Sequence, residues 1–341
     1  MAVFLLNPAD IVGNDRINPI QLGPFRQIRE DAAQDIYRRH IVSDDLDRAD
    51  LILAPAYGDV YGPCFEALRR WPLFEQYQAA LVVYSPDDLL HPTLPGLYPG
   101  CRPLWHRLGW AVPAHYRSEY WPSLDVQPDE IKERDLLYSF VGSVRNHPVR
   151  APLMQLAHSR AYLRDSSPDK QWWDRPREEQ AVFRERYRES LLRSKFVLCP
   201  RGVSPSSIRL FEAMEAGTVP VVIADGLELP HGPKWSEFSL RVSEHAIAGL
   251  PRLLEEWEEN AAEMGQKARQ VWEDYFSPWS SFNSLVNWAY SVQRIFHQRS
   301  YIFLRTLAYL AEFVQPRLVK RKLRFELASR AHCHNPHGRT K

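Results

Sequence analysis

The residues best suited to chemistry lie in one stretch, CPRGVSPSSIRLFEAMEAGTVPVVIAD, at positions 199–225. In this stretch Arg201 occupies a turn after an apolar run, and Ser206 and Ser207 precede a helical pattern. The N–H groups at the start of a helix that follows a parallel strand bind anions, and a guanidinium adds bidentate recognition of phosphate. The pattern therefore predicts a binding site for two linked phosphates.

Glu212 lies inside the same helical pattern, between two very apolar runs. An unpaired carboxylate there would be costly to bury, so we expect it to have a partner. Along a helix axis it lies roughly 9 Å from Ser206, a distance at which a carboxylate can accept hydrogen bonds from the ribose of a bound nucleotide. The combined ligand is then a nucleoside diphosphate. The alternative is an ordinary helix, capped by Ser204 or Ser206 and ended by Gly217, with no ligand.

These residues need strands and helices to position them, and the chain up to about residue 275 alternates apolar runs with helical patterns. Such alternation is typical of α/β folds with parallel sheets. We expect strands at residues 3–8, 49–57, 80–86, 136–143, 195–200, 219–225 and 239–244. We expect helices at residues 25–40, 64–80, 149–160, 176–194, 206–217 and 246–263, with a proline kink in the second.

Two such α/β series follow one another along the chain. Between them, from residue 86 to 128, prolines and glycines interrupt every regular pattern, so we expect long loops that line a cleft. The predicted division is a Rossmann-like domain at residues 1–130 and a second Rossmann-like domain at residues 131–275. C-terminal helices and a basic tail follow at residues 276–341.

Charge and composition argue against several classes of function. The 341 residues include 43 Lys and Arg against 42 Asp and Glu, a net charge of +1, which argues against nucleic acid as a partner. The four cysteines are scattered without a CxxC pair or a histidine at ligand spacing, so we expect neither a metal site nor disulfides. The first strand leads into LNPADIVGN in place of GxGxxG, which argues against a dinucleotide-dependent oxidoreductase.

No run of the sequence approaches the roughly 18 apolar residues that a membrane span needs. The N-terminus has no basic lead and no cleavage site of a signal peptide, so we expect a cytoplasmic protein. The basic stretch RLVKRKLRFELASR, residues 317–330, leaves two interpretations open. It is either a peripheral contact with anionic lipid or a helix that returns to the first domain with its basic side chains in water.

The run FVLCPRGVSPSSIRLFEAMEAGTVPVVIADGLELP, residues 196–230, resembles the signature of the exostosin-like glycosyltransferases, glycosyltransferase family forty-seven. A weaker resemblance extends to RADLILAPAYGD and FVGSVRNHPVRAPLMQL and covers residues 45–260 in all. The resemblance implies a GT-B architecture, in which two Rossmann-like domains face a cleft and C-terminal helices pack back on the first. It also implies an inverting transfer of sugar from a nucleotide diphosphate-sugar, with UDP expected, and no metal or other cofactor.

The family signature places its donor-side positions on Arg145 or Arg150, Arg201, Ser206, Ser207, Arg209 and Glu212. The resemblance implies that these residues bind the nucleotide-sugar, and that Arg201 also stabilises the departing phosphate. A glycan or a lipid-linked glycan would be the acceptor. Many other GT-B enzymes have a second acidic residue eight positions before the ribose-binding glutamate. That position is Ser204 here, so their retaining mechanism does not carry over.

A carboxylate or a histidine on the first domain is needed to take the proton from the acceptor hydroxyl. The candidates are Asp59, Asp87, Asp88, His91 and His115. The carboxylates have ordinary alternatives, because the Asp87–Asp88 pair can cap a helix and Asp59 beside a glycine can form a turn.

An aromatic group in the proline-rich segment has two interpretations. It comprises Trp105, Trp110, Tyr116, Tyr120 and Trp121. These rings either stack on acceptor sugars or pack in the core. For the whole chain, the alternative to an enzyme is a non-catalytic nucleotide-sugar or glycan-binding protein with a degenerate transferase site.

Overall fold

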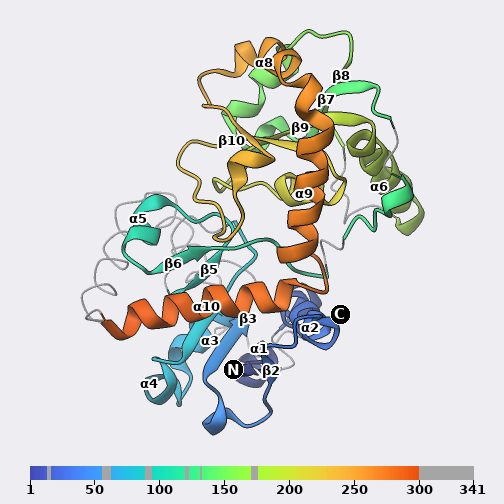
Figure 1. The fold of residues 1–341 in the computed structure, drawn as a ribbon. Coiled ribbons are helices and arrows are strands. Elements are labelled where there is room, and N and C mark those ends of the chain that lie inside the picture. The colour runs from blue at the N-terminus through green and yellow to red at the C-terminus, as the bar shows by residue number, and fades with distance from the viewer. Residues whose placement is uncertain are drawn as a thin grey trace, which may run out of the picture.

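The computed structural model of the chain describes residues 1–13, 17–55, 63–88, 94–119, 123–130, 133–169 and 176–298. Within these residues the strands form two parallel sheets, and the two α/β units built on them lie one above the other (Figure 1). We call them the first unit, with the N-terminal sheet, and the second unit. Two parallel sheets with helices around them confirm the expected Rossmann-like α/β class.

The sheet of the first unit has the strand order β2-β1-β3-β4-β5-β6. The strands are β1 (Ala2–Leu5), β2 (Ile41–Val42), β3 (Leu51–Pro55), β4 (Leu81–Tyr84), β5 (Gly96–Tyr98) and β6 (Ala111–Pro113). Every residue of β3 and β4 is buried. Strands covered on both faces read as continuous apolar runs, which is why the sequence predicted these two.

Short and medium helices surround the first sheet. They are α1 (Pro8–Val12), α2 (Pro19–Gln34), α3 (Pro63–Arg70), α4 (Phe74–Tyr77), α5 (Pro103–Arg107) and the 3₁₀ turn Leu46–Arg48. Helix α2 begins earlier than expected, because Asn18 and Gln21 form a capping box at its start. The helix expected at residues 64–80 is broken into α3 and α4, with Pro72 between them.

The proline-rich segment contains regular structure, so the expectation of loops alone was wrong. Strands β5 and β6 and helix α5 lie inside it. Two of its prolines occupy tolerated positions, because Pro103 is at the first turn of α5 and Pro113 ends β6. Trp105 and Trp110 are buried in the core of the first unit, so for these two rings packing, and not sugar stacking, is correct.

The sheet of the second unit has the order β11-β10-β9-β7-β8. Its strands are β7 (Leu136–Gly142), β8 (Ala161–Asp165), β9 (Ser194–Pro200), β10 (Val219–Ile223) and β11 (Leu240–Arg241). The helix expected at residues 149–160 was wrong. Prolines at 148 and 152 break that segment into the 3₁₀ turns Pro148–Arg150 and Pro152–Gln155, and β8 follows.

The helices of the second unit are α6 (Arg177–Leu192), α7 (Arg209–Glu215), α8 (Leu250–Glu256) and α9 (Ala261–Tyr275). Further 3₁₀ turns lie at Pro128–Glu130, Val144–Asn146, Trp235–Glu237, Ile247–Gly249 and Glu258–Asn260. Helix α7 starts later than expected: Ile208 precedes it and no side chain caps it, so the prediction of Ser204 or Ser206 as the cap was wrong. Its expected end is confirmed, since Gly217 has a φ of +63° and the Thr218 N–H donates to the Ala213 carbonyl at 2.9 Å.

Helix α10 (Ser281–Gln298) leaves the second unit and packs on the first sheet, against β3, β4, β5, β6 and α2 (Figure 1). Its fully buried apolar residues include Phe282, Leu285, Val286, Ala289 and Val292. This confirms that a C-terminal helix returns to the first unit. No helix in the described ranges combines the length and the apolar character needed to cross a membrane.

Candidate functional site

The order of the second sheet points to one edge as its binding site. The connections from β7 and β9 lead to opposite sides of the sheet, because β7 is followed by β8 and β9 by β10 in the order β8-β7-β9-β10-β11. In open parallel sheets, ligands bind outside the carboxyl ends of the strands at such a switch point. Here those ends are Gly142 and Pro200, and Arg201 comes directly after the second. The stretch singled out in the sequence therefore lies at the expected place.

Arg150 links the ends of strands β7 and β9. It is 4% exposed, and its guanidinium donates from Nε to the Arg201 carbonyl at 2.8 Å, from Nη1 to the Ser143 carbonyl at 3.0 Å and from Nη2 to the Pro200 carbonyl at 3.3 Å. Burial, together with the nearby charge of Arg209, lowers the pKa of Arg150 to about 9. Three of its five N–H groups are thus committed to main-chain oxygens. This geometry makes Arg150 a residue that positions the Arg201 turn.

We expect Arg150→Lys to destabilise the protein by about 2–4 kcal/mol, since a single ammonium cannot replace a fork that satisfies three buried carbonyls. The measurement is urea unfolding at equilibrium. Arg145→Lys is the matched control, because Arg145 is exposed in the neighbouring turn and its replacement should change stability by less than about 0.5 kcal/mol. Equal effects of the two substitutions would contradict the role given to Arg150.

Arg209 is the second guanidinium of the site, and it is half-buried. Its Nε donates to the Val141 carbonyl at 2.7 Å, and its guanidinium lies over the ring of Phe140 at 5.1 Å from the centroid. Gly142 allows this approach, because a Cβ there would collide with Nη2 of Arg209. Arg209 is therefore fixed against β7, with its charge turned toward the switch point.

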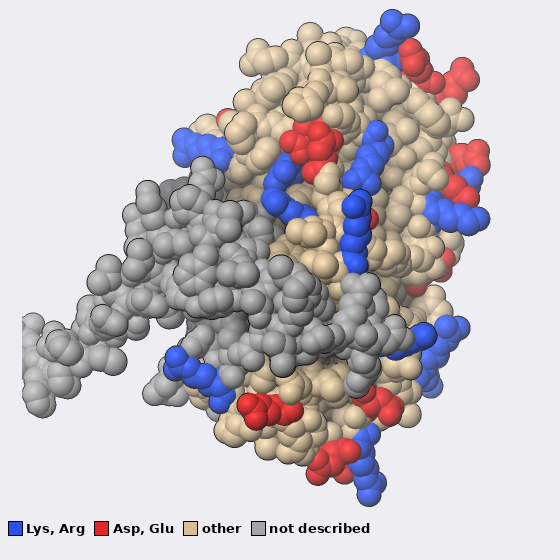
Figure 2. All heavy atoms as spheres, turned by 90° about the vertical axis from the view of Figure 1, so that its left-hand side faces the viewer, with Lys and Arg blue, Asp and Glu red and all other residues tan. Residues whose placement is uncertain are grey.

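Arg201 is held more loosely than the other two. Its Nη1 lies 3.6 Å from Oε1 of Glu244, an ion pair in which both side chains are mostly covered. Within the described residues its Nε is buried and has no hydrogen-bond partner. Figure 2 shows basic side chains close to an acidic group on the upper part of the molecule, which is the second unit. Of the three arginines, Arg201 has the guanidinium that is most available to an anion.

The three serines of the signature line a buried loop before α7. Ser204, Ser206 and Ser207 are all less than 9% exposed. Because α7 begins only at Arg209 and the Leu210 N–H already donates to the Ser207 carbonyl, phosphate binding at the helix start by Ser206 and Ser207 stays a prediction. The hydroxyl of Ser204 instead donates to Oδ1 of Asp88, at 2.8 Å.

Asp88 is the carboxylate of the first unit that the fold brings to this loop. It follows β4, is exposed, and accepts from the Ser204 hydroxyl and, at 3.2 Å, from the Tyr116 hydroxyl. Asp87 is half-buried, and its Oδ1 accepts the Asp88 N–H at 2.8 Å. Asp59 and His91 lie outside the described residues. Asp88 is therefore the described carboxylate candidate seen in contact with the signature.

His115 is enclosed in the core. It is 1% exposed, its Nε2 is 2.8 Å from the Ser281 hydroxyl, and its ring packs against Phe211 and Phe276. Burial, and then the charge of Arg117, hold its pKa well below the usual value. A histidine in this position has no route to an acceptor hydroxyl.

Glu212 has the partner that its burial required. The Tyr187 hydroxyl, on α6, donates to its Oε2 at 2.5 Å, and burial raises the pKa of Glu212. Tyr187 was missed in the sequence, because it lies in the charged run RPREEQAVFRERYRESLLRSK, which reads as a solvated helix face. The spacing of Phe183, Tyr187 and Leu191 along that helix is the signal that would have found it.

Residues 105–257 match the family model of the exostosin GT47 domain. The match begins in α5, crosses to the second unit and includes all of the signature stretch. This segment is an exostosin GT47 domain.

Curated relatives are similar to parts of the chain. A probable glucuronoxylan glucuronosyltransferase of Arabidopsis thaliana is 48% identical over 71 residues, which are 20% of this chain and 15% of the relative. A probable glucuronosyltransferase of Oryza sativa subsp. japonica is 32% identical over 159 residues, 42% of this chain and 33% of the relative. Exostosin-1 of Bos taurus is 32% identical over 94 residues, 27% of this chain and 13% of the relative. The chain thus spans a third or less of the length of these relatives.

Solved structures resemble the chain only loosely. HepE of Anabaena in complex with UDP has a TM-score of 0.34 at 12% identity and covers 84% of this chain and 98% of its own. MurG of Acinetobacter baumannii has a TM-score of 0.34 at 12% identity and covers 87% and 99%. Similarity at this level adds nothing to what the two sheets already establish.

A buried ion pair in the first unit holds the segment that presents Tyr116 to the GT47 signature. Nε of Arg117 donates to Oδ2 of Asp31 on α2 at 2.7 Å, and the Tyr84 hydroxyl donates to the His115 carbonyl at 2.9 Å. Tyr116 then contacts Asp88 with its hydroxyl and the edge of Phe211 with its ring. Tyr116 thus lies in the site, whereas Tyr120 and Trp121 are outside the described residues.

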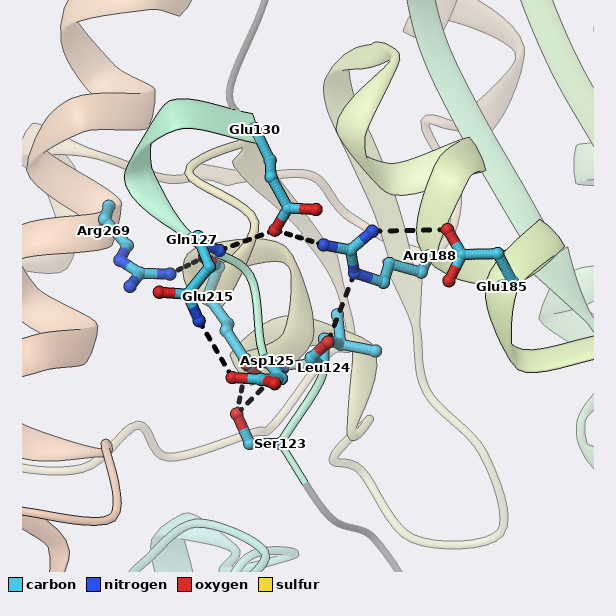
Figure 3. Close-up of polar contacts among 9 residues, drawn as sticks. All are labelled: Ser123, Leu124, Asp125, Gln127, Glu130, Glu185, Arg188, Glu215 and Arg269. Atoms are coloured by element: carbon cyan, nitrogen blue, oxygen red, sulfur yellow. Dashed lines mark hydrogen bonds and ion pairs between the residues drawn. The ribbon is translucent and has the colours of Figure 1, made fainter. Parts of the chain in front are cut away.

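The chain between the two units is tied to the second unit at Glu215 and Arg188 (Figure 3). Glu215 is 3% exposed and accepts the Asp125 N–H at 2.8 Å and the Ser123 hydroxyl. Nε of Arg188 donates to the Leu124 carbonyl at 3.2 Å, and its guanidinium pairs with Glu130. This connection is therefore a fixed part of the second unit.

Proposed function

We propose that the protein is an inverting glycosyltransferase that moves a sugar from a nucleotide diphosphate-sugar to a hydroxyl of a glycan. The observation that carries the proposal is the position of Arg201 and Glu212 in a GT47 domain, at the switch point of the second sheet. UDP is the expected nucleotide. Because two relatives are named as glucuronosyltransferases, UDP-glucuronic acid is the first donor to test.

In the proposed mechanism, negative charge grows on the departing diphosphate while the sugar becomes oxocarbenium-like. A guanidinium at that position stabilises the charge, and Arg201 is the residue proposed to provide it. Arg150 and Arg209 hold the ends of β9 and β7 in place around it. A guanidinium can balance this charge in place of a divalent ion, so the proposal includes metal-independent turnover.

Asp88 is the proposed base. Inversion requires that the acceptor hydroxyl attack from the side opposite the diphosphate, and Asp88 approaches the signature loop from the first unit. The Ser204 and Tyr116 hydroxyls both donate to the same oxygen, Oδ1. Among the residues that the structure describes, none donates to Oδ2, so this oxygen can accept from an acceptor hydroxyl. Asp88 then takes the proton as the new bond forms.

We expect replacement of the Glu212 carboxylate to raise the stability of the protein and to lower its affinity for UDP. The pKa of Glu212 is raised by burial, so its ionised form costs stability at neutral pH, and this cost disappears as the pH falls through the raised pKa. Glu212→Gln keeps an acceptor for Tyr187, so we expect Tm at pH 7 to rise by about 2–4 °C and the gap from the wild type to narrow toward pH 5. Affinity for UDP should fall about tenfold if the carboxylate binds ribose. Thermal unfolding across this pH range, combined with calorimetric titration of UDP, tests both halves.

The function is tested by thermal-shift screening with UDP, GDP and ADP and their sugar conjugates, followed by transfer assays with glycan acceptors in EDTA. We expect UDP-sugars to stabilise the protein, transfer to survive EDTA, and NMR of the product to show an inverted anomeric centre. Retention of configuration at the anomeric carbon, or activity that is restored only by a metal, would contradict the proposed mechanism. Donor binding without transfer to any acceptor would support a nucleotide-sugar-binding protein with a degenerate site instead.

A further inference from the structure

A segment of the first unit docks on the second unit beside the switch point. The Cys101 carbonyl accepts the Glu228 N–H at 3.1 Å, and Nε2 of His106 lies 2.8 Å from Nε2 of His231. Glu228 and His231 belong to the loop that follows β10, and Nε1 of Trp288 donates to the His231 carbonyl at 3.0 Å. Residues 101–106 are therefore held against this loop at both ends.

This docking places Arg102 at the edge of the sheet where Arg201 lies. Strands β9 and β10 are neighbours, and the Arg201 N–H donates to the carbonyl of Ile223, the last residue of β10. The loop that carries Glu228 begins directly after Ile223. Arg102, next to Cys101, thus lies against the loop that begins at this end of the sheet, and its side chain is half-buried.

The charge of Arg201 acts on Arg102. Burial lowers the pKa of Arg102, and the charge of Arg201 lowers it further. His147, in the second unit, has its pKa lowered by burial and then by the same charge. Glu244 is the carboxylate that pairs with Arg201, and at 3.6 Å it does so loosely. Positive charge from both units therefore converges on one place, which favours a multivalent anion between them.

We propose that Arg102 is the first unit's contribution to the donor site, and that Arg102 and Arg201 hold the diphosphate of the donor between them. The inference rests on the proposed function and adds to it a binding residue outside the signature stretch. Arg150 is not proposed to bind the diphosphate, because three of its N–H groups donate to main-chain carbonyls. A diphosphate held by both arginines also bridges the two units, so donor binding should strengthen the docking of residues 101–106.

The test compares UDP with uridine, which lacks the phosphates, on the full chain. For Arg102→Gln we expect the Kd of UDP to rise about 10- to 100-fold. The affinity for uridine, followed by saturation-transfer NMR, should change less than twofold. Arg102→Lys should recover part of the UDP affinity, because the charge remains without the fork. Arg107→Gln removes the same charge from an exposed position at the end of α5, the helix that follows Arg102, and should bind UDP like the wild type.

The outcomes separate this inference from the function on which it rests. If the wild type binds UDP and Arg102→Gln binds it equally well, the role of Arg102 is refuted while the donor site stands. Equal losses of UDP and uridine affinity would also refute it, since they would indicate a general disturbance of the fold. If the wild type binds no nucleoside diphosphate among UDP, GDP and ADP, the proposed function itself fails, and this inference with it.

Discussion

Arg201→Gln should lower turnover at saturating donor by about 100- to 1000-fold, the usual effect of removing a group that stabilises charge in the transition state. The protein should stay folded, because the substitution removes a guanidinium whose Nε has no partner within the described residues and whose ion pair with Glu244 is long. The measurements are kcat with a stabilising UDP-sugar and Tm by calorimetry.

The control for Arg201 is Arg252→Gln on α8, an arginine of the second unit whose side chain is 88% exposed. We expect that variant to keep wild-type turnover. A loss of less than tenfold for Arg201→Gln would mean that the charge of the leaving diphosphate is stabilised elsewhere, and the proposed mechanism would have to be abandoned.

The second large effect concerns Asp88. Asp88→Asn should reduce transfer by about 100- to 10,000-fold, the range typical of losing a general base, while the affinity for UDP stays within about threefold. An asparagine can still accept from Ser204 and Tyr116, so the contact between the units is kept and only the proton acceptor is lost. Single-turnover transfer and calorimetric titration of UDP separate the two quantities.

Asp87→Asn provides the matched comparison, since the neighbouring carboxylate accepts the Asp88 N–H. We expect it to lose less than tenfold in transfer. If Asp87→Asn has the larger effect, or if Asp88→Asn transfers sugar at the wild-type rate, Asp88 is not the base. Ser204→Ala adds a further check, because it removes the hydroxyl contact and leaves the carboxylate in place.

The strands that the sequence predicted best are those buried on both faces, such as β4 and β10, because full burial selects an uninterrupted apolar run. Strand β8 was not predicted, because none of its residues is fully buried and its sequence, AYLRD, therefore has no apolar run. The start of α7 was predicted too early, because serines are common helix caps. The local sequence does not show that the Ser204 hydroxyl donates to Asp88 instead.

The sequence predicted the site residues that belong to the family signature, but not those whose role depends on tertiary contacts. Arg201 and Glu212 stand out in one stretch of sequence. The commitment of Arg150 to three carbonyls depends on β7 and β9 being neighbours, which no local pattern reveals. Arg102 has no signal at all in the sequence, because its position follows from the docking of its segment on the loop after β10.

The return of α10 to the first sheet means that the first unit is not continuous in the sequence. Residues 281–298 cover β3 to β6, so a recombinant fragment that stopped at the connection near residue 125 would expose the apolar side of those strands to water. Such a fragment should aggregate on its own and become soluble when it is co-expressed with the remainder of the chain. The first unit can therefore be studied only in the presence of the rest of the chain.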